Sequence, residues 1–524
     1  MKIFSMKPGH DGAICVIDSE QKKLVFSWEA EKDSFPRYEV FNPELMMSAA
    51  MEMDCFPDVF AVSGWAKGGF VDNSNIGAGY AGFGKGTTIN NESSFFGIKS
   101  RYFSSTHLRS HIMSAYAMSP FPQGQPCYSL VWEGAFGDFY LIDEKLNINH
   151  VGNVMITPGN KYGFLYSLAD PSFRLPKGQQ RLGDAGKLMA LCAYGKSGEM
   201  TEKERETIEF LLNRDSILTS LDKEDMRWSP YYNIGLQSPE FVNLAKRFSD
   251  ELFNRFLTFA NKNLMKGYPL LISGGCGLNC DWNTMWKDSG LFSDVFIPPC
   301  CNDTGSAIGT AADAMFNLTG NAKLDWDVYS GQEFIDDMPE IIEIKGISVK
   351  PLDTNYVANL LFDGKILGWA KGRCEIGPRA LGNRSILAAP FEEKTQTRLN
   401  DIKKREYFRP IAPICREEEV SQHFDWKGPS PYMLFFQKVT NSSLKAITHV
   451  DGTARVQTVN ENQNPDIYSL LSSFKAISGC GVLCNTSLNF NGTGFINRTS
   501  DLYRYAKENH LDGFIYEDNM CIFD

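Results

Sequence analysis

Two histidines one helical turn apart are the first residues whose spacing indicates chemistry. Ser105-Thr106 can cap a helix whose first turns carry His107 and His111, so the i, i+4 spacing places both imidazoles on one face. Such a pair is more often two ordinary histidines than two metal ligands. Carboxylates in turns supply further oxygen ligands, and two imidazoles with carboxylates favour iron(II), manganese or zinc with open coordination positions. The candidate carboxylates are Glu133, Asp138 and Asp303.

A second candidate site is the basic segment 365–409. It contains 11 Lys/Arg and 5 Asp/Glu, a net charge of +6 within a chain whose total is -11. Its arginines alternate with glycines and a proline, so they cannot all lie on the solvated face of one helix. A planar guanidinium suits bidentate binding of phosphate or carboxylate oxygens, which predicts a site for a small phosphorylated substrate. A basic patch for protein or nucleic-acid contact is the alternative, but glycine turns rather than aromatic residues are interleaved with the charges.

Glycine turns give a third kind of candidate. Gly274-Gly275 follows the strand-like run 269–273 and precedes Asn279 near a helix start, where backbone N–H groups and the helix dipole attract a nucleotide phosphate. Lys187, beside a glycine, is a further candidate phosphate contact, although a lone lysine in this setting is usually a solvated turn residue. The segment 79–86 lacks the Ser or Thr that follows the lysine of a P-loop, so a surface or lid loop is predicted there.

Short apolar runs predict the elements that position these residues. Runs at 2–6, 12–18 and 24–30, separated by turns, predict a three-stranded antiparallel meander. The same strand-turn-strand order recurs over 127–155, which suggests two related half-domains. A duplicated unit with a phosphate-approaching glycine turn in each copy is typical of the actin-like ATPase architecture. We therefore expect an α/β fold.

Composition limits the class of protein. The chain has 524 residues, too many for one ordinary core, and its 43% hydrophobic and 22% charged residues are typical of folded globular proteins. The acidic stretch 321–345 loses periodicity and predicts a linker, with a domain boundary near 335. Without a signal-peptide pattern or an 18-residue uncharged run, a cytoplasmic protein is expected. The thirteen cysteines are expected to be reduced and mostly buried.

The motifs taken together match a known family. Over nearly the whole chain the sequence resembles the nodulation-type O-carbamoyltransferases, which include antibiotic-tailoring enzymes, and its opening motifs are most similar to the cephem branch. The stretches that carry the resemblance are KPGHDGAICVID, EAEKDSFPRY, HLRSH, GKLMALCAYG, SGGCGLNC, PPCCNDTGSAIGTAA, GRCEIGPRALGNRSI, IKKREYFRPIAP, DGTARVQTV and NTSLN.

The resemblance implies a fold and an activity. It implies an N-terminal TsaD-like, actin-type domain over residues 1–335 and a C-terminal YrdC-like domain over residues 336–524. In such enzymes the C-terminal domain uses carbamoyl phosphate and ATP, with magnesium, to form carbamoyl-adenylate. The N-terminal domain, which holds one divalent metal (iron(II) foremost, manganese or zinc as alternatives), then transfers the carbamoyl group to an alcohol. The acceptor expected is a hydroxyl, particularly a hydroxymethyl, of a small molecule or modified base.

The resemblance also implies roles for individual residues. His10, in the His10-Asp11 turn, is the family's candidate for contact with the reacting alcohol. The metal ligands carry over to His107, His111 and Asp303, whereas the family's remaining aspartate aligns with Glu133, a departure from the pattern. The carbamoyl phosphate and ATP site carries over to Arg373, Arg379, Arg384, Lys403, Arg405, Arg409 and Arg455, with Asn485 and Ser487 as polar partners.

Two other functions are considered. One is N-carbamoylation of a nucleic-acid base, which requires a nucleic-acid surface, and a net charge of -17 outside segment 365–409 argues against it. The other is a non-catalytic nucleotide-binding regulator, against which the intact arginine-glycine motifs count. Neither a membrane nor stable nucleic-acid binding is expected, and a homodimer is considered as an assembly.

Overall fold

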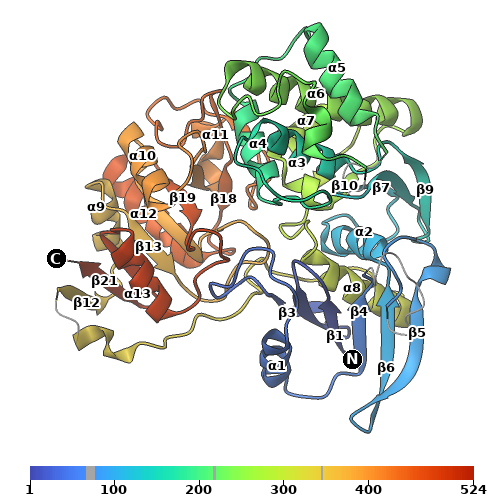
Figure 1. Cartoon of the computed structure of the whole chain (residues 1–524). Coiled ribbons are helices and arrows are strands. Elements are labelled where there is room, and N and C mark those ends of the chain that lie inside the picture. Colours follow the sequence, from blue (N-terminus) through green and yellow to red (C-terminus); the bar gives the residue numbers. More distant parts are fainter. Residues whose placement is uncertain (66–76, 216–219, 344–345, 524) are drawn as a thin grey trace. The chain divides into compact units, whose positions relative to one another are not determined.

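The computed structural model describes residues 1–65, 77–215, 220–343 and 346–523 (Figure 1). It divides into two compact units, which are described separately. The first unit comprises residues 1–118 together with 298–524, and the second comprises residues 119–297.

The first unit opens with a mixed six-stranded sheet in the order β3-β2-β1-β4-β6-β5. The first three strands form the predicted antiparallel meander, and β4 runs parallel to both β1 and β6. The strands are β1 (Lys2–Lys7), β2 (Ala13–Asp18), β3 (Lys23–Glu29), β4 (Val59–Ser63), β5 (Ile89–Phe95) and β6 (Ile98–Ser105).

Three helices accompany this sheet: α1 (Pro43–Glu52), α2 (His107–Met118) and α8 (Gly305–Thr319). Helices α2 and α8 pack so closely at Gly309 of α8 that an added Cβ there would lie 1.8 Å from the Ser110 carbonyl oxygen. A buried ion pair joins them, in which Arg109 donates to both carboxylate oxygens of Asp313 at 2.6 and 2.7 Å. The helix predicted after Ser105-Thr106 is therefore confirmed and rigidly held.

The second unit is built on a five-stranded sheet in the order β11-β10-β7-β8-β9. An antiparallel meander, β7-β8-β9, is again joined by its first strand to a parallel strand, β10. This repeats the arrangement of β1, β2, β3 and β4, so the predicted duplication is confirmed at the level of strand order. The elements are β7 (Cys127–Trp132), β8 (Gly137–Ile142), β9 (Ile148–Asn153), β10 (Leu270–Ser273), β11 (Val295–Phe296), α3 (Pro158–Ala169), α4 (Asp184–Cys192), α5 (Glu202–Leu212), α6 (Pro239–Asn263) and α7 (Cys280–Asp288).

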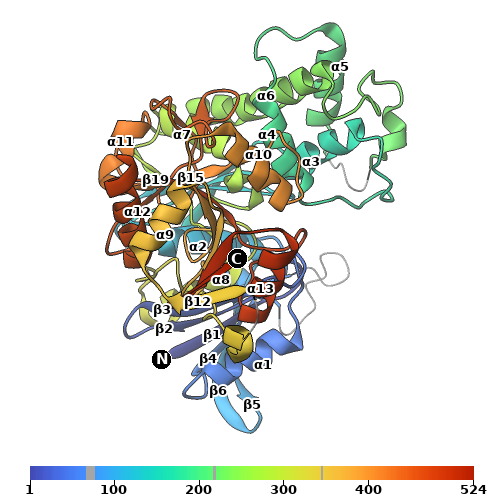
Figure 2. The same cartoon turned by 90° about the vertical axis from the view of Figure 1, so that its left-hand side faces the viewer.

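The C-terminal part of the first unit contains an eight-stranded sheet in the order β12-β21-β20-β13-β14-β19-β15-β18. Its apolar side chains form two clusters: one includes residues of α9 and α12, and the other includes residues of α10 and α13 (Figures 1 and 2). Consecutive residues of one strand, such as Ile386 and Leu387 of β14, therefore point to opposite faces of the sheet and pack into different clusters.

The bounds of this region are as follows: β12 (Ile347–Pro351), α9 (Thr354–Phe362), β13 (Leu367–Ala370), β14 (Arg384–Ala388), α10 (Glu393–Ile402), β15 (Ala412–Arg416), α11 (Val420–His423), β16 (Gln437–Lys438), β17 (Thr453–Ala454), β18 (Gln457–Val459), α12 (Pro465–Ser478), β19 (Val482–Ser487), α13 (Thr499–Glu508), β20 (Gly513–Tyr516) and β21 (Asn519–Phe523). The short 3-10 helices of the chain are η1 (Lys85–Thr87), η2 (Lys223–Met226), η3 (Gly275–Leu278), η4 (Pro339–Glu343) and η5 (Glu417–Glu419).

Within the first unit, an N-terminal segment is bound directly to the C-terminal region. The backbone N–H of Ser34 donates to Phe495 O at 3.0 Å, Arg37 N–H to Gly492 O at 2.9 Å, and Gly494 N–H to Phe35 O at 2.8 Å. This exchange resembles strand pairing and fixes residues after β3 against the turn before α13. The predicted domain boundary near 335 stays a prediction.

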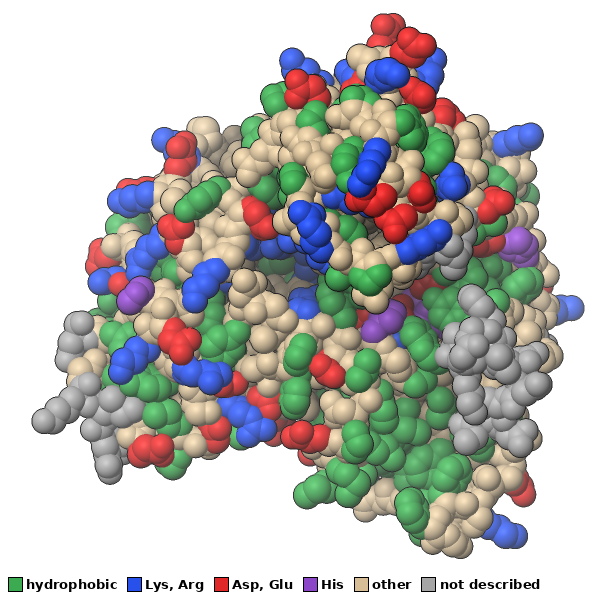
Figure 3. Space-filling model, in the orientation of Figure 1, with side chains coloured by type: hydrophobic (Ala, Val, Ile, Leu, Met, Phe, Trp, Pro, Cys, Tyr) green, Lys and Arg blue, Asp and Glu red, His purple; other side chains and the backbone are tan. Residues whose placement is uncertain are grey.

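The surface and the cysteines agree with a folded globular protein. Charged side chains of both signs are spread over the face seen in Figure 3, and hydrophobic side chains gather over α1, where Met47 and Met51 are 61% and 82% exposed. None of the thirteen cysteines forms a disulfide, and all but Cys55 and Cys276 are buried, as predicted. Every helix in the described ranges is too short or too polar to cross a membrane.

Candidate active site

His107, His111 and Asp303 direct one donor atom each toward a common point. The two imidazole Nε2 atoms are 3.2 Å apart, and Asp303 Oδ1 lies 3.6 Å from His107 Nε2 and 3.3 Å from His111 Nε2. Both histidines are buried in the first turns of α2, and Asp303 lies directly before α8. The close packing of α2 on α8 therefore sets the separation of the three side chains.

The three donors fit a divalent metal. Metal–nitrogen bonds of about 2.1 Å in a tetrahedral site place neighbouring donors about 3.4 Å apart, and the three observed edges bracket that value. Two imidazoles and one carboxylate on one side of an ion leave the other positions open for ligand oxygen atoms. A metal site needs further ligands beside His107 and His111, and the carboxylate of Asp303, distant in sequence, lies close enough to both to be one.

Aromatic rings and a glycine loop hold His107 in place. Tyr80 stacks on its imidazole with ring centroids 4.5 Å apart, and Trp65 meets it edge-on at 5.3 Å. The His107 N–H donates to Gly79 O at 3.2 Å, and Thr106 Oγ1 donates to Gly82 O. The glycine segment that lacked a complete P-loop pattern thus covers the start of α2.

His10 lies on the other side of Asp303. Its Nδ1 is 2.8 Å from Asp11 Oδ2 and 3.8 Å from Asp303 Oδ2. Burial lowers the pKa of His10, but the hydrogen bond to Asp11 and the Asp303 charge outweigh it, so the pKa lies above its ordinary value. Burial alone raises the pKa of Asp303, yet Lys7, His107 and His111 hold it well below its usual range. We call these residues the histidine–aspartate cluster: Lys7, His10, Asp11, His107, His111 and Asp303.

Glu133 and the predicted nucleotide residues belong to the second unit. Glu133 follows β7, and its backbone is fixed by hydrogen bonds with Phe136 and Gly159. Its role as a metal ligand stays a prediction. Gly274, with φ of 94°, lets the chain pass Trp132 O, which an added Cβ would approach to 2.5 Å.

The remaining predicted nucleotide residues have structural roles. Asn279 caps α7 by accepting from the N–H groups of Asp281 and Trp282, and Gly275 begins the short helix before it. Lys187 lies on α4 with its ammonium 3.4 Å from Asp184. These roles are compatible with a phosphate site at the β10–α7 turn, which stays a prediction.

A group of cations around one buried lysine forms a second site in the first unit. Lys403 is buried, and its ammonium donates to Ser487 O, Asn489 O and Asn489 Oδ1 at 2.7, 2.9 and 2.6 Å. Burial and the charges of Arg405, Arg409 and Arg37 hold its pKa well below its usual range. Burial, followed by Arg409 and Arg455, likewise lowers the pKa of Arg405. We call this set the basic cluster: Arg37, Lys403, Arg405, Arg409 and Arg455.

The basic cluster is only partly matched by negative charge. In the described part of the chain, neither Lys403 nor Arg405 pairs with a carboxylate, whereas Glu31 lies 3.0 Å from Arg37 and Glu406 lies 3.9 Å from Arg409. Several cations held together in a desolvated region are destabilising until an anion joins them. Arg409 is about one-third exposed, at 36%, so one member of the group is accessible to a ligand. The geometry therefore suits a phosphorylated ligand.

Asn485 and Ser487 lie on β19 beside this cluster. Asn485 is 1% exposed and donates to Ala380 O at 3.2 Å and Gln457 Oε1 at 2.9 Å. Its Oδ1 is buried and accepts no hydrogen bond from the described residues. Ser487 meets the cluster through its carbonyl oxygen, to which Lys403 donates. Arg379 acts on the same neighbourhood through its electrostatic effect on Tyr38, next to Arg37.

Arg373 and Arg384 differ from the other predicted phosphate-binding arginines. Arg384 is fully buried, and its guanidinium donates to Asn497 Oδ1 and to backbone oxygens of the loop before it. Arg373 donates to Gly331 O, Ser330 O and Val25 O at 3.0 to 3.1 Å. The charges that act on its pKa are Glu333, Glu52 and Asp327, not the basic cluster. Both arginines thus contact oxygens of the protein itself, and their role in phosphate binding stays a prediction.

The loop between these arginines is ordered by an internal carboxylate. Glu375 is fully buried, and its Oε1 accepts from the backbone N–H groups of Leu381, Asn383 and Arg384 at 2.7, 2.9 and 3.1 Å. Gly377, with φ of 87°, lies against the chain before Asp303, where an added Cβ would come 2.3 Å from Pro299 O. The arginine-glycine loop is therefore packed directly against the segment that carries a predicted metal ligand.

Sequence reasoning missed Lys7, Arg37 and Glu375. Each belongs to a motif that carried the family resemblance, but none stood out by its spacing. The signal for Lys7 was a charge at the end of an apolar run, and the signal for Glu375 was a single carboxylate between two arginines of the basic segment; a buried charge requires a partner.

Comparison with known proteins identifies the family. A family model described as "Carbamoyltransferase N-terminus" matches residues 97–312, and one described as "Carbamoyltransferase C-terminus" matches residues 358–522. The chain is 46% identical over 519 residues to 3'-hydroxymethylcephem-O-carbamoyltransferase of Amycolatopsis lactamdurans, covering 99% of this chain and 98% of that protein. The chain belongs to the carbamoyltransferase family. It is also 46% identical over 521 residues to the corresponding protein of Streptomyces clavuligerus, covering 99% of this chain and 98% of that protein.

A more distant relative of this carbamoyltransferase also matches almost the whole chain. Nodulation protein U of Sinorhizobium fredii (strain NBRC 101917 / NGR234) is 32% identical over 570 residues, covering 98% of this chain and 99% of that one. The family resemblance expected from the motifs is thus confirmed. Among solved structures, the activator of 2-hydroxyisocaproyl-CoA dehydratase from Clostridium difficile covers 61% of this chain and 96% of that one, at 9% identity and a TM-score of 0.35. A TM-score this low carries no argument, so the actin-like and YrdC-like descriptions stay predictions.

Proposed function

We propose that the protein is an ATP-dependent O-carbamoyltransferase that acts on a hydroxymethyl group of a cephem-like small molecule. Full-length similarity to two enzymes named for that reaction supports the acceptor class. The observation that carries the chemistry is the pair of sites in one compact unit: a cluster of metal-type ligands beside His10, and a cluster of cations around the buried Lys403.

The basic cluster serves the activation step. Water first hydrolyses carbamoyl phosphate, so that the bond to the phosphoryl group breaks, phosphate leaves and carbamate remains. A carboxyl oxygen of the carbamate then bonds to the α-phosphorus of ATP as the bond from that phosphorus to pyrophosphate breaks. Both reactants are polyanions, so their approach needs neutralisation by fixed positive charge. Arg405, Arg409 and Arg455 supply that charge, and Arg379 extends it toward Tyr38. In this proposal the region after about residue 335 is the YrdC-like domain that forms carbamoyl-adenylate.

The histidine–aspartate cluster serves the transfer step. The alcohol oxygen attacks the carbamoyl carbon, its proton passes to His10, and AMP leaves. Asp11 lies against His10 Nδ1, so Nε2 is the nitrogen that accepts the proton, and the carboxylate stabilises the imidazolium that results. The raised pKa of His10 matches this role as a base near neutral pH.

His107, His111 and Asp303 would hold the divalent metal, with Glu133 as a further predicted ligand. When bound, iron(II), or manganese or zinc in its place, supplies Lewis-acid polarisation of a donor oxygen. The half-buried aromatic residues Trp65 and Tyr80 pack on the imidazole of His107 and keep it oriented.

Mass spectrometry of reactions with hydroxymethyl-bearing acceptors tests the proposal. Purified protein with ATP, magnesium, carbamoyl phosphate and a hydroxymethylcephem should give a product heavier by one carbamoyl group, together with pyrophosphate. An aminoglycoside, a sugar and a hydroxymethylpyrimidine serve as competing acceptors. Carbamoylation of a nucleic-acid base in place of these alcohols, or no pyrophosphate release in the presence of carbamoyl phosphate, would contradict the proposal.

A further inference from the structure

Lys7 is a fully buried lysine to which no role has yet been assigned. It is the last residue of β1, and its side chain is 0% exposed. The ammonium lies 3.1 Å from Asp303 Oδ2, donates to the carbonyl oxygen of His10, and stands 3.8 Å above the ring of Trp65. Burial of an ammonium costs several kcal/mol unless it is paired, and here every side of it has a partner.

The contacts of Lys7 divide the two oxygens of Asp303 between two tasks. Oδ1 lies 3.6 and 3.3 Å from the imidazoles of His107 and His111. Oδ2 lies 3.1 Å from Lys7 and 3.8 Å from His10 Nδ1. An ion held by the imidazoles thus meets one carboxylate oxygen, because the other is already bound to an ammonium.

We propose that Lys7 is a positioning residue that keeps Asp303 a one-oxygen metal ligand and keeps a positive charge beside the ion. This inference rests on the proposed function. A carboxylate shared with an ammonium donates less negative charge to the metal, so the ion binds less tightly and stays a stronger Lewis acid. The same ammonium fixes the carbonyl of His10, so one side chain sets both the metal ligand and the base.

The sign of the effect on metal binding separates this role from simple structural support. A residue that only supports the site would weaken metal binding when removed. Removal of a cation a few ångströms from a divalent ion should instead strengthen it, because charge repulsion at this range is worth several kcal/mol even at an effective dielectric of about 20. Transfer should nevertheless slow down, since the ion is less electrophilic and His10 less well fixed.

The test is a titration of the metal-free full-length protein with Mn²⁺ alone. Lys7→Met should bind Mn²⁺ at least about tenfold more tightly than the wild type, and Lys7→Arg, which keeps the charge, should stay close to the wild type. Lys161→Met is the matched control, since Lys161 is a buried lysine of the second unit that donates to Leu212 O at 3.0 Å. Its Mn²⁺ affinity should be unchanged.

Activity provides the second measurement. Lys7→Met should transfer carbamoyl groups on the order of a hundredfold more slowly, with unchanged release of pyrophosphate. Equal or weaker Mn²⁺ binding in Lys7→Met, tighter binding in Lys7→Arg, or no Mn²⁺ binding by the wild type would overturn the inference. If Lys7→Met does not fold, as judged by circular dichroism, Lys7→Gln takes its place under the same criteria. The titration contains neither ATP nor carbamoyl phosphate, so its failure is distinct from a failure of the proposed function.

Discussion

The histidine–aspartate cluster and the basic cluster lie in the same unit but differ in whether their charged groups are paired with opposite charges. In the first, Asp303 is surrounded by Lys7, His107 and His111, so positive and negative groups meet at 3.1 to 3.6 Å. In the second, the buried Lys403 and the half-buried Arg405 lie beside other cations, and neither pairs with a carboxylate of the described residues. The difference teaches that the first site is balanced in charge without a ligand, whereas the second, under the proposed function, is completed by the anions of the substrates.

Loss of both imidazoles should have the largest effect. The variant His107→Ala/His111→Ala removes two of the three donors that converge on one point, so stoichiometric metal should fall to background. Elemental analysis of the purified protein measures this. His150→Ala/His510→Ala is the matched control, since neither residue lies in α2. Unchanged metal content in the first variant would disprove the site.

Loss of the base should abolish transfer and spare activation. His10→Ala removes the group that accepts the alcohol proton, so carbamoyl transfer should fall by roughly 10² to 10⁴. Pyrophosphate release from ATP and carbamoyl phosphate should continue, because His10 does not contact the basic cluster. The two rates are measured in one reaction. A parallel fall of both would mean that the two clusters act as a single site.

Loss of an accessible arginine should give the reverse pattern. Arg409→Ala removes one charge-assisted phosphate contact, worth a few kcal/mol, so carbamoyl-adenylate formation should fall about a hundredfold. Supply of preformed carbamoyl-adenylate should restore product. Arg398→Ala is the control, because Arg398 lies on α10 and pairs with Asp512 at 2.8 Å. If Arg409→Ala activates normally, the assignment of the basic cluster is wrong.

Thermal unfolding tests whether the cations around Lys403 need an added anion. Arg405→Met removes a half-buried cation that pairs with no carboxylate of the described residues, so without added anions its unfolding temperature should equal or exceed that of the wild type. Inorganic pyrophosphate should raise the unfolding temperature of the wild type by a few degrees and that of Arg405→Met by less. Arg504→Met, at an exposed pair with Asp501, should show the full pyrophosphate effect. A large destabilisation by Arg405→Met in the absence of anions would show that the cluster is already balanced.

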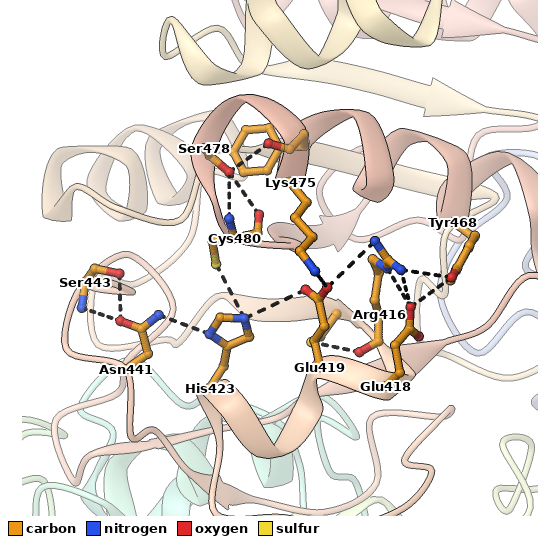
Figure 4. A network of polar contacts seen from close by, with 12 residues as sticks. Arg416, Glu418, Glu419, His423, Asn441, Ser443, Tyr468, Lys475, Ser478 and Cys480 are labelled. Carbon is orange, nitrogen blue, oxygen red and sulfur yellow. Dashed lines mark hydrogen bonds and ion pairs between the residues drawn. The ribbon is translucent and has the colours of Figure 1, made fainter.

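The smallest effect concerns a polar network of the C-terminal sheet that belongs to neither cluster (Figure 4). His423 Nδ1 lies 3.0 Å from Asn441 Nδ2, with Glu419, Lys475 and Cys480 around the ring. Burial lowers the pKa of His423, although Glu419 opposes this. The unfolded chain therefore takes up the proton first, and the free energy of unfolding should decrease as the pH falls through about 6.5.

Denaturant unfolding between pH 7.5 and 5 measures this dependence. His423→Gln should show a shallower loss of stability toward acid than the wild type, and His510→Gln, at an exposed position, should match the wild type. An identical slope in His423→Gln and the wild type would show that His423 is not kept neutral by the fold.

Local spacing predicted much of this molecule because it depends on single elements. The meander of β1 to β3, its repeat in β7 to β9, and the helix that begins at His107 all follow from apolar periodicity and cap residues. Distances between elements do not follow in this way. The approach of Lys7 to Asp303, across almost 300 residues, depends on the packing of α8 against β1.

The arginines of the basic segment also show that contacts between elements do not follow from the sequence. Arg373 and Arg384 carried the same family signal as Arg405 and Arg409, yet their guanidinium groups bind backbone oxygens. Residue type and composition predict that a segment is basic, but they do not predict whether a given guanidinium meets a ligand or the protein's own carbonyl groups.

The carboxylate of Glu375 has a consequence for how activation is controlled. This carboxylate belongs to the chain and already accepts from three N–H groups of the arginine-glycine loop. Because it is covalently attached, a dissolved phosphate ion competes poorly with it for these N–H groups. In the proposed activation step, we therefore expect the loop to be ordered before the substrates bind. Recognition is then left to side-chain charges, whose attraction for an anion weakens as dissolved salt shortens the screening length. Ionic strength, more than the conformation of the loop, should then control the rate of the first half-reaction.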